Sequence, residues 1–295
     1  MKGLAKYAVA SSVFTLAYFG PWMPRDLEEI TGFFRKRSAV ELNPNKRVSG
    51  DLLVVIPART IEPNQSITDV MQTLSERAKE PSKVKVVVVH ENPSALLSAA
   101  EFLEKSVAFK MVQVVQARQG GGRGPTQNLG AKTSDSELLL FCHADTMVPI
   151  NYDELIRQAL VDDSILMCAF SLGLDEESTT LEFVANSANL RSRFWWMPYG
   201  DQTLSFRTTF FLNEMGGFRE DYKIMEDFEL VQRVRSRALK SHNEKIHIFK
   251  DPVVSSARRW REKGAVKATF LNWAFCAAYV YLGLSPDEIF NLYYR

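Results

Sequence analysis

The residues best suited to chemistry follow an uninterrupted apolar run, LLLFC, at positions 138–142. His143 and Asp145 come directly after this run. An apolar run without alternation is typical of a strand covered on both faces of an α/β sheet, and ligands of such sheets bind beyond the carboxyl ends of the strands. A carboxylate there can hold a divalent cation, which can in turn hold phosphate groups. These residues leave a second interpretation open, in which Asp145 caps the following turn.

A Gly-rich loop precedes this strand, and QGGGRGPTQNLGAK covers residues 119–132. Glycines leave backbone amides free to approach an anion, and the Arg fork is a preferred partner of phosphate. Arg118 and Arg123 are therefore candidate phosphate ligands. The loop matches neither the dinucleotide-binding nor the P-loop pattern, so a flexible loop is the alternative. Thr126, Gln127 and Asn128 then enter a short predicted helix.

Two further segments carry charged residues in suggestive places. Glu226 and Asp227 begin the helix-like segment EDFELVQRVRSRA. A carboxylate can act as a general base there, although acids in the first turn of a helix are also favoured by the helix dipole. Arg258, Arg259 and Trp260 lie in SSARRW, where a solvated basic face or a patch for anionic lipid headgroups is one interpretation.

Regular alternation of strand and helix patterns indicates how these residues are positioned. Strands are expected at 51–58, 84–90 and 110–117, and helices at 66–79, with Ser66 as the cap, and at 94–106. This order predicts right-handed βαβ crossovers and a parallel sheet. The sequence therefore predicts an α/β fold.

The composition sets broader bounds on the class of protein. The chain has 295 residues, 46% hydrophobic and 24% charged, which suffices for a full core in one large or two smaller domains. The net charge of +1 gives no reason to expect a nucleic-acid partner. Cys142, Cys168 and Cys276 are far apart and form no CxxC pair, so we expect buried thiols.

Both ends of the chain contain apolar segments. Residues 7–24 carry no charge and follow Lys2 and Lys6, so residues 1–23 are expected to form a hydrophobic anchor or a signal segment. The alternative is a helix packed on the domain. Residues 24–50 are predicted to be a short helix and linker, and residues 270–284 an interfacial or packed helix. Together the two apolar segments predict membrane association, with the topology left open.

Several motifs in one order carry a family resemblance. VVIPA, GRGPTQNLGA, LLLFCHADTMVP, PYGDQTLSFRTTFFLNEMGGF, MEDFELVQRVR and SSARRW occur in succession. The chain from residue 51 to 294 resembles the family 2 glycosyltransferases of the GT-A fold, and is most similar to a small bacterial-type branch with an HADT acidic motif. The resemblance implies one GT-A domain over residues 51–295, built on a single Rossmann-like, mostly parallel sheet flanked by helices. It also implies transfer of a sugar from a nucleotide-sugar donor to an acceptor hydroxyl on a glycan, lipid or small molecule, usually with inversion and with Mg²⁺ or Mn²⁺.

The resemblance also assigns roles to residues. Asp145 corresponds to the metal ligand, with His143 as a second ligand or a hydrogen-bonding neighbour, and Asp227 corresponds to the general base, with Glu226 beside it. Trp195, Trp196 and Tyr199 could stack on a sugar or belong to the core. Arg258, Arg259 and Trp260 correspond to a lid over the diphosphate. The implied donor-binding residues are Pro57, Glu62, Arg123, Gln127, Asn128, Asp201, Gln202, Arg258, Arg259 and Trp260.

The sequence departs from the family pattern at two places. Arg59-Thr60-Ile61-Glu62 follows the first strand in place of Asn-Glu, and His90-Glu91-Asn92 ends the second strand in place of Asp-Gly-Gly-Ser-x-Asp. The aspartate that grips the nucleobase in the family is therefore absent. Two alternatives to a catalytic glycosyltransferase follow: a noncatalytic, membrane-associated relative that binds a sugar or a partner, and a nucleotidyltransferase on a similar sheet. The second lacks a Gly-rich turn directly after the first strand.

Overall fold

The computed structural model describes residues 20–35, 42–58, 67–92 and 108–294. Most of the predicted anchor, the predicted helix at 94–106, the predicted cap Ser66 and the donor candidate Glu62 lie outside these residues. The boundaries of the predicted anchor, linker and domain therefore stay predictions.

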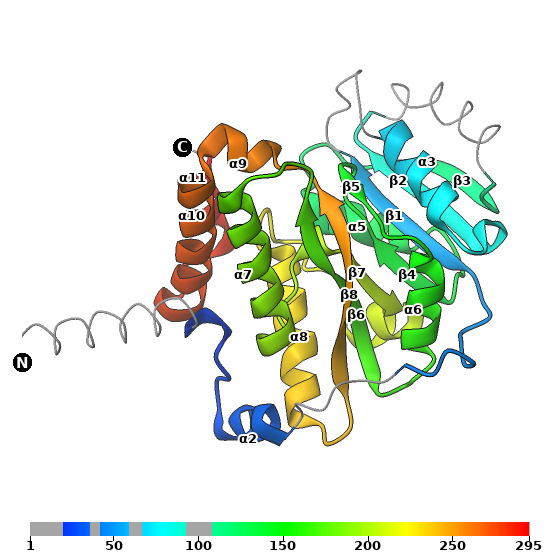
Figure 1. The fold of residues 1–295 in the computed structure, drawn as a ribbon. Helices are drawn as coiled ribbons and strands as arrows, with labels where there is room; N and C mark the ends of the chain where they lie inside the picture. The colour runs from blue at the N-terminus through cyan, green and yellow to red at the C-terminus, as the bar shows by residue number, and fades with distance from the viewer. Residues whose placement is uncertain (1–19, 36–41, 59–66, 93–107, 295) are drawn as a thin grey trace, which may run out of the picture.

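The described chain forms one eight-stranded sheet with helices on both faces (Figure 1). The strand order is β3-β2-β1-β4-β7-β6-β8-β5. The strands are β1 Leu52–Ala58, β2 Val84–His90, β3 Met111–Gln116, β4 Leu138–Phe141, β5 Thr146–Met147, β6 Ile165–Leu174, β7 Leu204–Arg207 and β8 Lys245–Ser255. The α-helices are α2 Leu27–Arg35, α3 Ile67–Arg77, α5 Arg123–Ala131, α6 Tyr152–Leu160, α7 Thr179–Trp195, α8 Glu226–Lys240, α9 Arg258–Lys263, α10 Ala265–Ala277 and α11 Pro286–Tyr293.

The first half of the sheet is parallel, as the alternation of strands and helices predicts. Strands β3, β2, β1 and β4 pair in parallel. Side chains of β1 alternate between two separate cores: Leu53 and Val55 pack with α5 and α8, whereas Leu52 and Val54 pack with α3 and α6. Strand β4 alternates in the same way, with Leu139 and Phe141 in the first core and Leu138 and Leu140 in the second. The strand expected to be covered on both faces is therefore confirmed, as is the α/β fold class.

The second half of the sheet is mixed. Strand β7 lies antiparallel between β4 and β6, and β5 pairs antiparallel with β8. Phe141 at the end of β4 pairs with Leu204 at the start of β7. Thr146 pairs with Ser255 at the end of β8. The segment before β7 and the segment after β8 are thereby brought beside the residues that follow β4.

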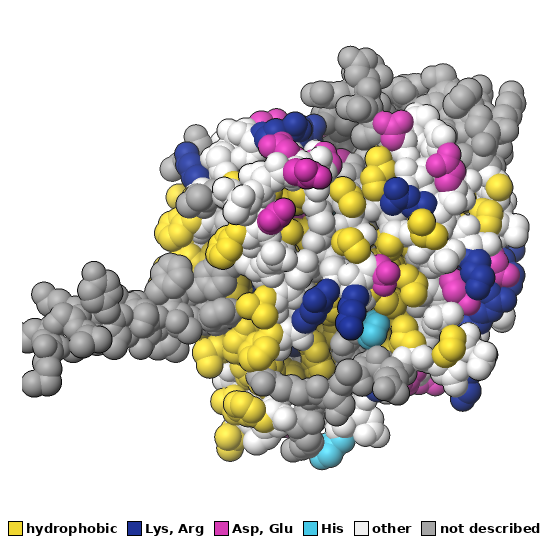
Figure 2. Space-filling view, in the orientation of Figure 1, with side chains coloured by type: hydrophobic (Ala, Val, Ile, Leu, Met, Phe, Trp, Pro, Cys, Tyr) yellow, Lys and Arg dark blue, Asp and Glu magenta, His cyan; other side chains and the backbone are white. Residues whose placement is uncertain are grey.

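The N-terminal residues of the described chain pack against the helices. The side chain of Trp22 is 3% exposed, and α2 packs on α8. Phe33 of α2 stacks on Trp195 of α7, with 5.0 Å between ring centroids. Other large apolar side chains remain exposed. Figure 2 shows hydrophobic side chains gathered on part of one face of the molecule. Among the described helices, we find none whose length and apolar content suffice for a membrane crossing.

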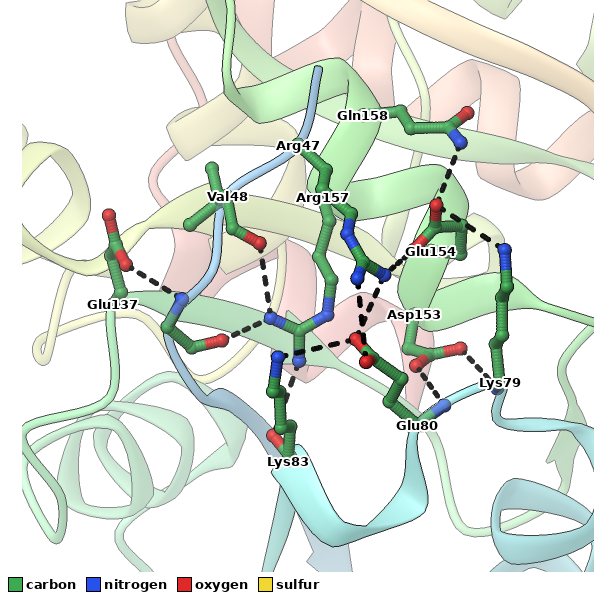
Figure 3. A network of polar contacts seen from close by, with 11 residues as sticks. Arg47, Val48, Lys79, Glu80, Lys83, Glu137, Asp153, Glu154, Arg157 and Gln158 are labelled. Atoms are coloured by element: carbon green, nitrogen blue, oxygen red, sulfur yellow. Dashed lines mark hydrogen bonds and ion pairs between the residues drawn. The ribbon is translucent and has the colours of Figure 1, made fainter. Parts of the chain in front are cut away.

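Residues 42–50 form a strap that is fixed to α6 by charged side chains (Figure 3). The fully buried guanidinium of Arg157 donates hydrogen bonds to the backbone carbonyls of Val48, Gly50 and Lys83. Arg47, on the strap itself, forms ion pairs with two acids, Glu80 at 3.0 Å and Glu154 of α6 at 2.8 Å. The strap thus leads directly into β1, and its Val48 and Gly50 carbonyls are paired with Arg157.

The three thiols are all free and buried, as the sequence predicts. Burial raises the pKa of the Cys142 thiol and of the Cys276 thiol to about 12. Both therefore remain protonated at neutral pH and serve as small apolar side chains.

Candidate active site

Residues predicted from separate motifs meet at one cavity of about 160 Å³ at the carboxyl end of β4. The walls come from the residues after β4, the segment before β7, the start of α8 and the helices after β8. The predicted site residues on its walls are Arg123, His143, Asp201, Glu226, Asp227, Arg259 and Trp260.

Asp227 lies in the first turn of α8, and its carboxylate is held by two backbone amides. The Gly200 amide donates to Oδ2 at 2.8 Å, and the Phe228 amide donates to Oδ1 at 2.7 Å. A carboxylate has about four lone-pair positions, so both oxygens keep acceptor capacity. Asp227 is thus fixed in direction and can still accept a proton from a ligand in the cavity.

Gly200 allows the base candidate and His143 to approach each other. A Cβ atom built on Gly200 would lie 3.1 Å from Asp227 Oδ2 and 3.1 Å from His143 Nε2. Both separations are tighter than ordinary van der Waals contact, so a side chain here would push the two groups apart. The close packing of Asp227 and His143 therefore explains why a glycine occupies this position of the PYGDQ segment.

A positive charge lies next to the two acids of α8. Arg123 begins α5, and its Nε atom is 3.6 Å from Glu226 Oε1. Desolvation opposes the charge of Arg123, but Glu226 and Asp227 outweigh it and raise the pKa of the guanidinium. Glu226 is 3% exposed, whereas the Arg123 side chain is about half exposed. Arg123 therefore neutralises a buried acid and still presents donors at the cavity.

His143 is a neutral, unpaired imidazole. Burial, reinforced by Arg123, lowers the pKa of His143 to about 3. Its Nε2 atom is buried and has no hydrogen-bond partner among the described residues. A neutral imidazole nitrogen in this position can bind a metal ion or pair with a polar ligand group.

Asp145 is partly exposed on the turn between β4 and β5 and is not part of the cavity wall. Desolvation raises the pKa of its carboxyl, while Arg258 and Arg123 act in the opposite direction. Within the described ranges, no group of three or more His, Cys, Asp or Glu side chains is arranged to hold a metal ion.

Asp201 and Trp260 also present unpaired polar atoms. Asp201 Oδ1 and Trp260 Nε1 are buried and find no hydrogen-bond partner in the described part of the chain. Burial raises the pKa of Asp201, and the nearby Asp227 adds to the rise, although Arg191 opposes it. Buried polar atoms are usually paired, so these atoms are available to a ligand.

Other predicted donor-binding residues have structural partners instead. The amide of Asn128 exchanges two hydrogen bonds with the backbone of Phe218, both at 2.9 Å. The fully buried Gln202 accepts from Arg191 and Ser192 and donates to the Phe170 carbonyl. These two amides join segments of the fold rather than line the cavity.

The remaining candidates do not line the cavity. Gln127 is buried in α5, and its Oε1 atom has no partner among the described residues. Pro57 is in β1, and Arg258 is an exposed residue at the start of α9. Trp195 packs on Phe33, as the core interpretation expects.

Sequence analysis missed the wall that the C-terminal helices contribute. Asn272 and Cys276 of α10, Tyr293 of α11 and the adjacent Tyr294 line the cavity, and Lys223, just before α8, lines it as well. Lys263 reinforces this wall, with Nζ 3.8 Å from the centroid of the Tyr293 ring. The adjacent aromatic residues Tyr293 and Tyr294 were the signal that the sequence offered for this wall. Periodicity alone could not place them near Asp227.

Comparison with known proteins gives structural but not sequence relatives. No protein-family model matches the sequence, and no curated protein does so either. TarS from S. aureus matches with a TM-score of 0.51 and 15% identity over 81% of this chain and 41% of TarS. The chain thus spans about two fifths of the length of TarS.

A second solved structure is matched over most of its length. The mannosyltransferase PcManGT from Pyrobaculum calidifontis, in complex with GDP-Man and Mn²⁺, has a TM-score of 0.55 and 18% identity over 96% of this chain and 83% of PcManGT. Residues 1–349 of TarS give a TM-score of 0.50. The chain therefore has the α/β fold of these glycosyltransferases.

Proposed function

We propose that this chain is a family 2 glycosyltransferase that moves a sugar from a nucleotide-sugar donor to the hydroxyl of an acceptor, with inversion. The observation that carries the proposal is the meeting of Asp227, Arg123 and His143 at one cavity beyond the end of β4. The fold shared with known glycosyltransferases supports it. The order of the sequence motifs supports it independently.

The chemistry would be a single displacement. The acceptor oxygen attacks the anomeric carbon, and Asp227 takes the proton from that oxygen. The bond between the anomeric carbon and the phosphate oxygen breaks, and the nucleoside diphosphate leaves with the electron pair. Arg123 and Arg259 line the same cavity and offset the negative charge of the leaving group. A positioned base of this kind contributes about 10²- to 10⁴-fold to the rate.

We also propose a divalent cation, Mg²⁺ or Mn²⁺, beside the diphosphate. The carboxylate of Asp145 suits such an ion, since Mg²⁺ is commonly held by one or two carboxylates together with phosphates and waters. His143, whose Nε2 atom has no partner among the described residues, would be a second ligand or would pair with a polar group of the donor. When bound, the ion would neutralise the charge of the departing diphosphate.

A noncatalytic relative remains the second candidate, because positions near the expected nucleobase pocket are occupied by internal contacts. Glu91 accepts a hydrogen bond from the Gly120 amide at 3.1 Å, and the Asn92 amide donates to His90 Nδ1 at 2.8 Å. Such a protein would bind a sugar or a partner without transferring a sugar.

The deciding experiment incubates the full chain with Mn²⁺ and a panel of UDP-, GDP- and dTDP-sugars. Donor binding is measured by calorimetry and donor hydrolysis by nucleotide release. We expect one donor to be hydrolysed, and we expect Asp227→Asn to bind it with similar affinity but to turn over about 10²- to 10⁴-fold more slowly. The exposed Asp163→Asn is the matched control. Binding with no turnover, unchanged in Asp227→Asn, would favour the noncatalytic relative, and no binding of any donor would contradict the proposed transferase.

We further propose that the chain associates with a membrane through its uncharged N-terminal segment. Residues 7–24 carry no charge and follow two lysines, a pattern that suits an anchor or interfacial segment.

A further inference from the structure

Helix α7 presents an apolar stripe to solvent. Phe183, Leu190 and Phe194 are 70%, 55% and 41% exposed. Their spacing of seven and four residues places them on one face of the helix. The opposite face of α7 is buried through Leu181 and Val184. Phe194 also contacts the ring of Trp195, at 4.9 Å between centroids, yet it remains 41% exposed. The stripe therefore keeps a large part of its apolar surface in contact with solvent.

Helix α2 presents a second stripe in the same region. Leu27, Ile30 and Phe34 are 76%, 39% and 71% exposed at a spacing of three and four residues. Phe33 of this helix contacts Phe194 of α7, with 5.7 Å between ring centroids. In Figure 2, hydrophobic side chains gather in the lower left part of the view, and basic side chains lie beside them. The two stripes therefore adjoin, and large contiguous apolar surface on a soluble domain marks an interaction site.

A basic groove of about 610 Å³ runs along α7 next to its stripe. Leu190, Arg193 and Phe194 line one side, and Ser171 and Lys250 lie on the other. Arg193 Nη2 donates to Ser171 Oγ at 2.8 Å, which fixes the guanidinium at the groove. Lys250 is exposed and makes no ion pair within the described residues.

No acid lines the groove among the described residues. The neighbouring Asp251 is exposed but is not part of its wall. Two cations without a carboxylate between them suit a phosphate-bearing group, and the apolar stripe beside them suits acyl chains.

The N-terminal segment reaches the described structure at this same region. The uncharged run 7–24 includes Trp22, which is buried and held by two hydrogen bonds. Trp22 Nε1 donates to Tyr199 Oη at 3.0 Å, and Arg235 donates to the Trp22 carbonyl at 2.7 Å. Helix α2 begins five residues after Trp22. The described end of the uncharged run, residues 20–24, is thereby fixed at Trp22 and leads into α2. An uncharged run that enters this face favours a bilayer over a protein partner as its occupant.

We propose that the face formed by α2 and α7 docks on an anionic lipid bilayer, with its apolar stripes in the headgroup region and with Arg193 and Lys250 binding lipid phosphates. This docking surface goes beyond the proposed sugar transfer and does not depend on it. It assigns an orientation to the domain, which the N-terminal segment alone would not fix.

The test places an environment-sensitive fluorophore on one cysteine of the full chain. The three native cysteines are buried, so an introduced surface cysteine can be labelled selectively. Leu190→Cys reports on the proposed face, and Ile150→Cys, at a residue 71% exposed between β5 and α6, is the matched control. Each labelled protein is mixed with vesicles of phosphatidylcholine, with or without about one third phosphatidylglycerol.

We expect a blue shift and a gain in emission at position 190 with the anionic vesicles, and no change at position 150. In the proposed arrangement, replacing Arg193 and Lys250 with Gln weakens vesicle binding about five-fold for each charge. Lys132→Gln with Arg219→Gln removes the same charges from α5 and the loop before α8 and should leave the signal at position 190 intact.

Four results would overturn the proposal. The label at position 190 could stay unchanged while the chain floats with the vesicles, which would leave the N-terminal segment as the only contact. The chain could bind neither kind of vesicle. The shift could be equal on uncharged vesicles, or it could appear without lipid as protein concentration rises, which would indicate a second copy on this face.

Discussion

At the scale of single residues, the candidate site is defined by polar atoms that lack partners. His143 Nε2, Asp201 Oδ1 and Trp260 Nε1 are buried and unpaired among the described residues. Each such atom costs about 1–3 kcal/mol of stability until it is paired, and these three line the same cavity, where one ligand can pair with them. The cavity is therefore arranged for a polar ligand at a cost to the free protein.

Replacing Asp201 with Asn should stabilise the protein at neutral pH. Burial raises the pKa of Asp201 above its ordinary value of 3.8, so this group favours the folded state below that value and opposes it as the pH rises through the folded pKa. The Asn side chain carries no charge at any pH, so Asp201→Asn removes this destabilisation of the folded state. A gain of 1 kcal/mol raises the melting temperature by about 2–4 °C in a domain of this size class.

Thermal denaturation at about pH 7 and about pH 4 tests this expectation, because the gain should shrink as Asp201 is protonated. The exposed Asp163→Asn serves as the control and should not shift the melting temperature. A lower melting temperature for Asp201→Asn at pH 7 would show that the carboxylate has a favourable partner.

The chemistry of the individual residues was predictable from sequence only in part. Arg123 and Asp227 could be found because a motif and a helix start both point to them. Asn128 and Gln202 belong to the same motifs, yet they are buried and pair with the fold. Burial depends on packing between segments far apart in the chain, which local sequence does not encode.

At the scale of elements, the site depends on how α5 is packed on the sheet. A Cβ atom built on Gly130 would lie 2.5 Å from Val55 Cγ1 and 2.9 Å from Val89 Cγ2. This close approach sets the helix on β1 and β2, and the same helix carries Arg123 at its start. The glycine therefore fixes the distance between the phosphate candidate and the acids of α8.

Gly130→Ala should lower the free energy of unfolding by about 1–3 kcal/mol, the usual cost of an overpacked core. Chemical denaturation measures this change. Leu129→Ala is the control on the same helix, since Leu129 is 37% exposed and faces away from the strands. An unchanged stability for Gly130→Ala would mean that α5 can shift without cost.

The strands themselves were predictable, but their order was not. The apolar run at 84–90 coincides with β2, because a strand buried on both faces needs no alternation. The antiparallel insertion of β7 between β4 and β6 has no local signature. It rests on pairings such as Phe141 with Leu204, which join residues distant in the chain.

At the scale of the whole molecule, the strap of residues 42–50 joins the N-terminal region to the sheet. Arg157 is fully buried and satisfies carbonyls on the strap and on the segment before β2. Its role could not be predicted, because an Arg in the middle of an amphipathic helix usually extends into solvent.

Arg157→Met should cost about 3 kcal/mol or more, since it roughly keeps the volume but leaves several buried carbonyls unpaired, at about 1–3 kcal/mol each. Arg47→Met is the matched control in the same network. The Arg47 side chain is 38% exposed, so the loss of its ion pairs should cost only about 0–1 kcal/mol. Urea denaturation of the two variants distinguishes these values, and equal losses would contradict the assigned role of Arg157.

The C-terminal wall of the cavity has a consequence for the order in which the chain matures. All eight strands and Asp227 are synthesised before residue 256, whereas Asn272, Tyr293 and Tyr294 follow. Because domains fold as their segments leave the ribosome, the sheet can form while this wall is still missing. A nascent chain would then hold Asp227 in an open cleft, and the cavity would close only when α10 and α11 dock.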